Sequence, residues 1–355
     1  MSPVSPNTSF TVRFRPLGPW RFGPDSGARD RVDLIYHSDA VFSAVCSAMR
    51  QLGMAEEWFE ATARSGAPAV RISSFYPFQG KTLLVVPPRN IWPPADSTKI
   101  RYKGARFVPL PVVESLLADK AIDENRWAVD GESECLIPHD GGRGPFRVAI
   151  RSSAGVDRLE TGKVESHSTA CLEFARDAGL WTVVQFADAS AAGKWQDSVR
   201  SAFALLADSG FGGERSRGWG RSETPEWAAW NSVVSRPLPD GRGSEVVAPP
   251  DIEPVIPPAT DRAYWLLSLY LPGSEDSVDW KRGSYSTITR RGRIESSVHW
   301  GEAKNATLMV SEGSVLVAGG ELNGAAHNIA PEGFAHPVYR AGFAVAIPIP
   351  WRVTA

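Results

Sequence analysis

One loop concentrates glycine and arginine in a pattern that could bind an anion. Residues 208–223 read DSGFGGERSRGWGRSE, with glycines at 210, 212, 213, 218 and 220. Glycine lacks a Cβ, so a ligand can approach its main chain closely, and successive N–H groups can form an anion-binding nest. Arg215, Arg217 and Arg221 add forked donors that suit phosphate. A tight hairpin turn would also explain the glycines.

Two common phosphate-binding motifs do not fit this loop. Gly213 and Gly218 have the spacing of a nucleotide-binding P-loop, but Trp219 and Gly220 stand where lysine and serine or threonine are needed. The dinucleotide fingerprint fails because Arg215 occupies its third glycine position. That fingerprint also opens a helix, whereas this loop follows one. The pattern therefore disfavours a mononucleotide and leaves a longer polyanion.

Composition predicts folded domains with locally segregated charge. The chain has 355 residues, 43% of them hydrophobic, with a net charge of −2. This length allows two domains. Residues 114–134 are acidic. The electrostatic field near each surface, rather than the net charge, decides which partner approaches it. The basic clusters are Arg89, Lys99, Arg101, Lys103 and Arg106 in one segment and Lys281, Arg282, Arg290, Arg291 and Arg293 in another.

The cysteines and histidines do not predict a disulfide framework or a metal site. The cysteines at 46, 135 and 171 form no C-x-x-C motif. Cys135 and His139 are four residues apart, as are His167 and Cys171. Each pair combines one cysteine with one histidine, whereas zinc sites usually contain a C-x-x-C pair. We interpret these as buried thiols and loop histidines, and expect no cofactor. The sequence has no apolar run of membrane length and no signal-like N-terminus, so we expect a cytoplasmic protein.

Hydrophobic periodicity predicts the elements that must position the loop. Residues 8–18 alternate as a strand, and a helix over 38–52 is expected to be capped by Ser38 and stopped by Gly53. Strands are expected at 69–78, 82–88, 146–153 and 180–187, with a helix at 194–208 before the loop. We read residues 89–145 as an irregular insertion. The order predicts an α+β fold with a ferredoxin-like βαββαβ core.

The chain divides into two units on either side of a region rich in proline and glycine. Residues 1–234 form the expected N-terminal domain, 235–262 a linker or long surface loop, and 263–355 a smaller, mostly β unit.

Several landmarks together resemble one protein family. They are HSD (37–39), SSFYPF (73–78), DRLETG (157–162), GFGGERSRGWG (210–220), SYSTITRRG (284–292), EGSV (312–315) and HPVYRAGFAVAIP (336–348). In this order they resemble the RAMP-superfamily subunit that caps the 5′ tag of the guide RNA in type III-A (Csm) CRISPR effector complexes. The resemblance spans nearly the whole chain except 235–258. The glycine-rich loop alone is typical of all RAMP proteins.

This resemblance implies a fold, a role and partners. It implies tandem ferredoxin-like (RRM-like) modules without catalytic activity or a cofactor. It further implies that the protein grips the 5′ tag and docks to the large palm-domain subunit and to a backbone RAMP subunit. No membrane is implied as a partner.

The same resemblance makes the glycine-rich loop and several basic residues candidates for RNA contact. Trp219 could stack on a base or pack the turn, and Glu214 could pair with an arginine and shape the loop. The loop candidates are Gly210, Gly212, Gly213, Arg215, Ser216, Arg217, Gly218, Trp219, Gly220 and Arg221. The candidates elsewhere are His37, Ser38, Lys99, Arg101, Lys103, Arg147, Arg151, Arg158, Arg290 and Arg291.

Two alternatives remain at the level of sequence. His37 could act as the general base for a 2′-hydroxyl in a related RAMP endoribonuclease that processes precursor RNA without a metal. The competing interpretation is that Ser38 and Asp39 cap the helix while His37 makes a local hydrogen bond. The chain could also be the equivalent subunit of another type III subtype. We favour the interpretation that the protein is a non-catalytic subunit.

Overall fold

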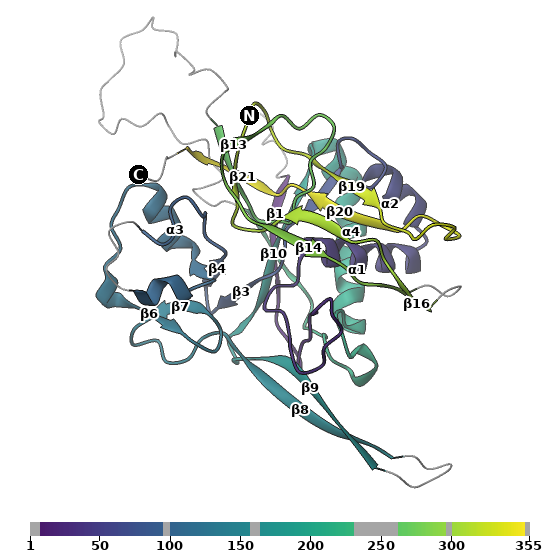
Figure 1. Ribbon diagram of the computed structural model, residues 1–355, viewed down its shortest axis with the longest axis horizontal. Coiled ribbons are helices and arrows are strands. Elements are labelled where there is room, and N and C mark those ends of the chain that lie inside the picture. The colour runs from purple at the N-terminus through teal and green to yellow at the C-terminus, as the bar shows by residue number, and fades with distance from the viewer. Residues whose placement is uncertain (1–7, 95–99, 157–163, 231–261, 296–299, 352–355) are drawn as a thin grey trace, which may run out of the picture.

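The computed structural model describes residues 8–94, 100–156, 164–230, 262–295 and 300–351. Figure 1 shows an α+β molecule with few helices and mostly antiparallel sheets, as the sequence predicts. No helix among the described residues has the length and apolar character needed to cross a bilayer. The predicted linker at 235–262 lies outside the described residues except for its last position.

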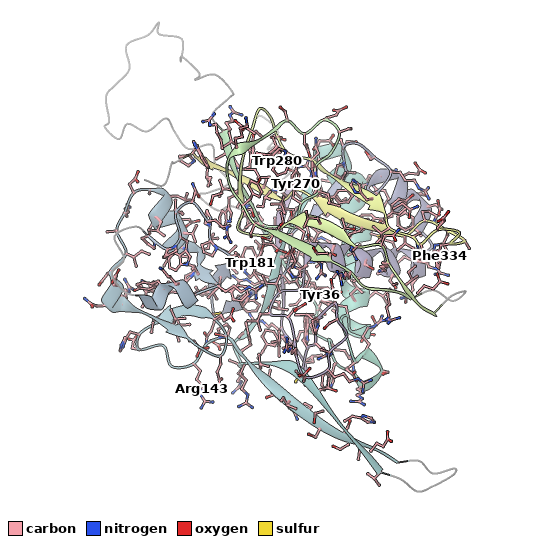
Figure 2. All side chains as sticks on the ribbon, in the orientation of Figure 1. Tyr36, Arg143, Trp181, Tyr270, Trp280 and Phe334 are labelled. Atoms are coloured by element: carbon pink, nitrogen blue, oxygen red, sulfur yellow. The ribbon has the colours of Figure 1, made fainter. Side chains whose placement is uncertain are left out.

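A seven-stranded sheet forms the centre of the N-terminal half. Its strands are β1 (Ser9–Phe14), β2 (Val70–Ile72), β3 (Tyr76–Gln79), β4 (Thr82–Val85), β5 (Val108–Pro109), β10 (Ala178–Phe186) and β11 (Glu226–Ala229). They are ordered β11-β1-β10-β3-β4-β5, and β2 also pairs with β10. Trp181 of β10, labelled in Figure 2, is fully buried and stacks on Trp230 with 5.5 Å between ring centroids.

Two long helices pack together and close the apolar core over this sheet. They are α1 (Ser38–Gln51) and α4 (Ala189–Ser209), and the short α2 (Ala55–Ala61) follows α1. α4 begins where the side chain of Asp188 accepts a hydrogen bond from the Ala191 N–H, and it ends at Gly210, whose φ is 80°. Both long helices agree with the predicted ones, although α4 begins five residues earlier.

The insertion at 89–145 is more ordered than predicted. It contains η1 (Ile100–Gly104), β5, α3 (Leu110–Leu117), η2 (Glu124–Arg126), β6 (Trp127–Asp130) and β7 (Cys135–Pro138). Prolines made the segment look irregular, but Pro111 lies in the first turn of α3, where its missing N–H removes no helical hydrogen bond. Val113 and Leu117 of α3 are buried in the main core, so the segment is part of the folded domain.

A long hairpin projects from the body of the molecule. β8 (Phe146–Val156) and β9 (Val164–Phe174) pair without interruption from Phe146 opposite Phe174 to Val156 opposite Val164 (Figure 1). At its base, the N–H of Trp20 donates to Leu172 O over 3.0 Å, and Leu172 N–H donates back to Trp20 O over 2.7 Å. The sequence predicted part of β8 but missed β9 and therefore the hairpin.

The C-terminal half contains strands and no helix within its described residues. Its four-stranded sheet has the order β13-β18-β12-β21, and three further strand pairs are β14–β17, β15–β16 and β19–β20. The bounds are β12 (Arg262–Leu266), β13 (Val278–Ser284), β14 (Thr287–Arg290), β15 (Arg293–Glu295), β16 (Trp300–Ala303), β17 (Thr307–Val310), β18 (Val315–Ala318), β19 (Gly324–Asn328), β20 (Tyr339–Phe343) and β21 (Ala346–Pro350). Trp265 and Phe343 join the N-terminal core.

Candidate nucleic-acid interface and the clamp beside it

The glycine-rich loop (residues 210–220) folds back against the segment that follows β1. The Gly213 N–H donates to Arg21 O over 2.9 Å, and the Gly220 N–H donates to Pro19 O over 3.0 Å. Between these anchors, Glu214 and Gly218 are left-handed, with φ values of 61° and 77°, and enclose the short turn η3 (Arg215–Arg217). The turn is therefore held at both ends while its middle stays on the surface.

The glycines of this loop have two different roles. A Cβ on Gly210 would lie 2.5 Å from Trp219 O, one on Gly212 would lie 2.5 Å from Arg21 O, and one on Gly220 would overlap Phe211 O. These three glycines are needed so that the loop itself can fold. Gly218 has nothing within 4 Å of its ideal Cβ position, so its main chain is open to a ligand.

The loop arginines are also not equivalent. Nε of Arg217 lies 3.2 Å from Glu214 Oε2, which confirms that Glu214 pairs with a loop arginine. Arg221 donates from Nε to Asp208 O over 2.7 Å, so it satisfies a carbonyl at the end of α4. Arg215 and Ser216 are exposed on the turn.

A pocket lies where this turn meets the middle of strand β8, and we call it the hairpin pocket. Its volume is about 360 Å³, and it is lined by Pro19, Arg151, Ser152, Ser153, Arg217 and Trp219. Arg151 on β8 and the loop residues Arg217 and Trp219 were predicted to contact RNA from two separate parts of the sequence. The structure brings them together because β8 passes beside the turn.

Arg147 and Arg151 on β8 share one carboxylate on β9. Nη2 of Arg147 lies 2.7 Å from Glu173 Oε2, and Arg151 forms an ion pair with Glu173 Oε1. The hydrogen bond from Arg147, followed by the bond and charge of Arg151, lowers the pKa of Glu173 despite some opposing burial. The carboxylate stays charged and orients both guanidinium groups along the hairpin.

A larger cleft opens on the other side of the turn, and we call it the long cleft. It encloses about 840 Å³ between α1, α2 and the turn on one side and the C-terminal strands on the other. Tyr36, labelled in Figure 2, and Phe59 contribute apolar surface. Basic residues outnumber the acidic Asp25, Asp39 and Glu56 in its lining; they are Arg50, Arg64, Arg215, Arg290, Arg291, Arg293, Lys304 and Arg340. Arg215 faces this cleft, whereas Arg217 lines the hairpin pocket.

Beside the long cleft, buried polar contacts join the two halves of the chain, and we call this group the clamp. Its members are His37, Ser38, Asp39, Ser74, Leu269, Arg290, Glu312 and Arg340. Nδ1 of His37 lies 2.7 Å from Glu312 Oε1, and the Ser74 hydroxyl donates to the same oxygen. The Leu269 N–H donates to Ser38 Oγ over 3.0 Å.

The clamp corrects two predictions about the HSD motif. His37 and Ser38 are each 5% exposed, and their side chains bond within the protein, so they are not available to RNA. Ser38 is also not the cap of α1, because α1 begins at Ser38 itself and the preceding residue, His37, makes no side-chain capping bond.

A second part of the clamp removes Arg290 from the predicted RNA contacts. Arg290 is 8% exposed, and its Nε lies 3.1 Å from Asp39 Oδ2. Arg340 Nε lies 3.4 Å from the same oxygen, and Arg290 Nη1 lies 3.2 Å from Asp25 Oδ1. Charge and hydrogen bonding from Asp39 outweigh burial and raise the pKa of Arg290. Arg291, the next residue, is exposed and faces the long cleft.

The remaining predicted RNA-contact residues lie away from the two cavities or outside the described residues. Lys103 is exposed on η1 but lines neither the hairpin pocket nor the long cleft. Arg101 belongs to the same turn, and Lys99 and Arg158 lie outside the described residues.

Sequence reasoning missed Arg21, a buried residue that supports the site. Its guanidinium donates to the carbonyl oxygens of Ala28, Arg29, Arg31 and Ala170. Its own carbonyl holds Gly213 of the glycine-rich loop. Nothing in the local sequence distinguished it from the other arginines of residues 19–33.

Comparisons with known proteins agree with this architecture. Residues 259–349 match the model of the CRISPR Csm4 C-terminal domain. A chain in a crystal structure of the Csm3–Csm4 subcomplex of a type III-A CRISPR-Cas interference complex superposes with a TM-score of 0.61 and 14% identity, over 96% of this chain and 99% of that one. A chain in a crystal structure of a Csm1–Csm4 cassette in complex with cA4 superposes with a TM-score of 0.57 and 16% identity, over 97% of this chain and 98% of that one. No curated protein matches significantly. The C-terminal sequence is thus similar to the Csm4 C-terminal domain, and the whole chain shares its fold with chains of these Csm3–Csm4 and Csm1–Csm4 structures.

Proposed function

We propose that this protein is a non-catalytic, RNA-binding subunit of a type III-A Csm complex. In this role it grips the 5′ tag of the guide RNA and joins the palm-domain subunit to the backbone in cytoplasmic antiviral defence. The supporting observation is the position of the glycine-rich turn between two cavities lined by arginines. The C-terminal domain match and the fold shared with chains of Csm3–Csm4 and Csm1–Csm4 structures support the assembly.

The order of the N-terminal strands supports a ferredoxin-like module. Strands β11, β1, β10 and β3 lie side by side in that order, with α1 between β1 and β3 in the chain and α4 between β10 and β11. This is a βαββαβ unit whose second and third strands are separated by the insertion and the hairpin. We assign the four-stranded C-terminal sheet to a second, divergent ferredoxin-like module that has no helix among its described residues.

A single RNA strand fits the surface better than a duplex. Unstacked nucleotides can place a base against Trp219 and phosphates against arginines on both sides of the turn. The open main chain at Gly218 allows a sugar-phosphate backbone to pass closely over the turn. Because these contacts go mainly to phosphate, the affinity should fall steeply with salt.

The clamp supports a non-catalytic role. A general base must reach the proton that it abstracts, but the imidazole of His37 is buried and occupied by Glu312. The geometry around His37 therefore favours a structural residue over the nuclease alternative.

The test compares binding of a repeat-derived tag RNA with binding of duplex DNA of the same length at several salt concentrations. We expect salt-sensitive retention of the RNA, weak binding of the duplex, and no RNA cleavage in EDTA. Arg215→Ala with Arg217→Ala should reduce RNA binding. Arg126→Ala, an exposed arginine on η2 that lines neither cavity, is the matched control. Equal affinity for RNA and duplex, or cleavage of the RNA, would contradict the proposal.

A further inference from the structure

We propose that Arg21 is a positioning residue that fixes the spacing between the glycine-rich turn and the hairpin, so that the two elements contact RNA as one rigid unit. This inference rests on the proposed RNA-binding function, and it concerns a side chain that does not itself reach the ligand. Arg21 is 7% exposed and lines neither the hairpin pocket nor the long cleft. It therefore acts on RNA only through the residues that it holds.

The main chain and the stem of Arg21 hold the start of the turn. Its carbonyl oxygen accepts from the Gly213 N–H over 2.9 Å, directly before Glu214 and η3. Its stem lies against the same glycine, because a Cβ on Gly213 would be 3.2 Å from Arg21 Cδ and 3.3 Å from Cγ. Carbon atoms pack best at about 3.5–4.0 Å, so only glycine fits here without moving the stem.

The guanidinium group of Arg21 holds the hairpin. Its Nη1 donates to Ala170 O on β9 over 2.7 Å, and Ala170 is paired with Ile150 on β8. Ile150 directly precedes Arg151, which lines the hairpin pocket. Arg21 therefore connects Gly213, at the start of the turn, with a position in the hairpin that is next to a predicted RNA-contact residue.

The remaining bonds of the guanidinium group fix it from a third side. Nη1 also donates to Arg29 O over 3.2 Å and to Arg31 O over 3.0 Å, and Nη2 donates to Ala28 O over 2.7 Å. Arg29 O in turn accepts from the Ala170 N–H over 2.7 Å, so both main-chain groups of Ala170 are held. Four carbonyl oxygens converge on one planar fork, a geometry that the three donors of a lysine ammonium do not reproduce.

The charge of Arg21 also acts on the turn. Its four carbonyl acceptors are neutral, so they do not compensate the charge. Burial lowers the pKa of Arg21, and the nearby charge of Glu214 opposes this effect. Glu214 is thus attracted by Arg21 and paired with Arg217, a residue of the hairpin pocket. This attraction carries the positioning effect outward from the buried arginine to the surface of the turn.

The first experiment measures the spacing directly and needs no RNA. Spin labels on Ser216→Cys in the turn and Ser166→Cys on β9 report the distance between the two elements, since both serines are exposed. Cys46→Ala removes the half-buried thiol from this background, and the other two cysteines are buried. We expect one narrow distance distribution for Arg21 and a broader one for Arg21→Met, which keeps a stem of similar length but removes the donors.

Two further variants separate positioning from stability. Arg71→Met is the matched control, because Arg71 is a half-buried arginine that donates to Leu322 O in the C-terminal half and lines neither cavity. It should lower the melting temperature but leave the distance distribution narrow. Arg21→Lys keeps the charge without the fork, so its distribution should stay broad. Equal broadening in Arg71→Met, or a narrow distribution in Arg21→Lys, would contradict the role of the fork.

Gly213→Ala tests the same contact from the side of the turn, and it decides the question if Arg21→Met does not fold. The added methyl group meets a stem whose far end is fixed by four hydrogen bonds, so the turn has to move. We expect a folded protein with a shifted mean distance between the labels. An unchanged distance would show that the Arg21 stem does not set the position of the turn.

Binding of the tag RNA then links the spacing to function. Folded Arg21→Met should bind the RNA about tenfold more weakly than wild type, which corresponds to the loss of one charge-assisted hydrogen bond to phosphate. Arg71→Met should bind like wild type. If Arg21→Met broadens the distribution but keeps the wild-type affinity, the inference is wrong and the proposed function stands. If wild type does not bind the RNA, the proposed function fails, and the distance measurement still decides whether Arg21 sets the spacing.

Discussion

Asp39 and Arg290 form a buried ion pair, with 3.1 Å between Asp39 Oδ2 and Arg290 Nε, although 251 positions separate them in the sequence. Asp39 is in the first turn of α1 and Arg290 ends β14, so the pair joins the N-terminal helix layer to the C-terminal strands. A carboxylate taken out of water at this depth is favourable only while its partners remain.

Asp39→Ala should therefore destabilise the fold strongly. It leaves Arg290 and Arg340 buried without their shared carboxylate, and breaking such a pair from one side typically costs about 3–5 kcal/mol. Urea denaturation measures the change, with Asp197→Ala on the exposed side of α4 as the control. A loss below about 1 kcal/mol would show that the pair does not hold the halves together.

Glu312 should make the free energy of unfolding fall as the pH is lowered through the acidic range. Burial alone would raise its pKa, but the charge and hydrogen bond of His37, with the hydroxyl of Ser74, lower the pKa to about 2. Because the folded pKa is below the unfolded one, this stability is fully present above about pH 4.5. It is lost as pH falls toward about 2. Melting curves of wild type and Glu312→Gln across this window should converge at its acidic end, and parallel curves would contradict the assignment.

Gly218→Ala and Gly220→Ala should separate binding from folding. Both positions have positive φ, at 77° and 80°, which costs alanine about 1–2 kcal/mol. Gly220→Ala must in addition displace the Phe211 carbonyl, so it should lower the free energy of unfolding further. Gly218→Ala should stay folded but bind tag RNA more weakly, because its methyl group would occupy the open space through which we propose that the RNA backbone passes over the turn. Denaturation and filter binding measure the two effects, and equal behaviour would refute this division.

Arg217→Ala and Arg221→Ala should likewise differ. Arg217 lines the hairpin pocket, so its loss should weaken RNA binding while the melting temperature changes little. Arg221 bonds to the Asp208 carbonyl at the end of α4, so its loss should lower the melting temperature while RNA affinity is largely kept. The opposite pattern would mean that Arg221, rather than Arg217, faces the RNA.

Much of the fold was predictable wherever one local signal sufficed. The periodicity before Gly210 predicts α4, and alternation predicts β1, because each pattern reports a single buried face. α3 was missed because prolines at its start resemble a break, and β9 because a projecting hairpin buries little apolar surface along much of its length.

The site was less predictable because its contacts are distant in sequence. No local rule indicates that His37 meets Glu312, which is 275 positions away, so an exposed polar role was assigned to a buried side chain. The HSD, TRR, EGSV and HPVYR stretches, which supported the family resemblance, meet in space at the clamp. Of their residues, His37, Ser38 and Arg290 were predicted to contact RNA, whereas in the structure they and Glu312 hold the two halves together.

The clamp has a consequence for a chain that is cut in two. Its bonds run from residues up to Ser74 to residues from Leu269 onward, so each half carries complementary partners. These non-covalent bonds should hold the two halves together even when the chain is cut between residues 231 and 261. Two fragments expressed separately should find each other and reassociate, as in a split-protein reporter, and Asp39→Ala in the first fragment should prevent that reassociation.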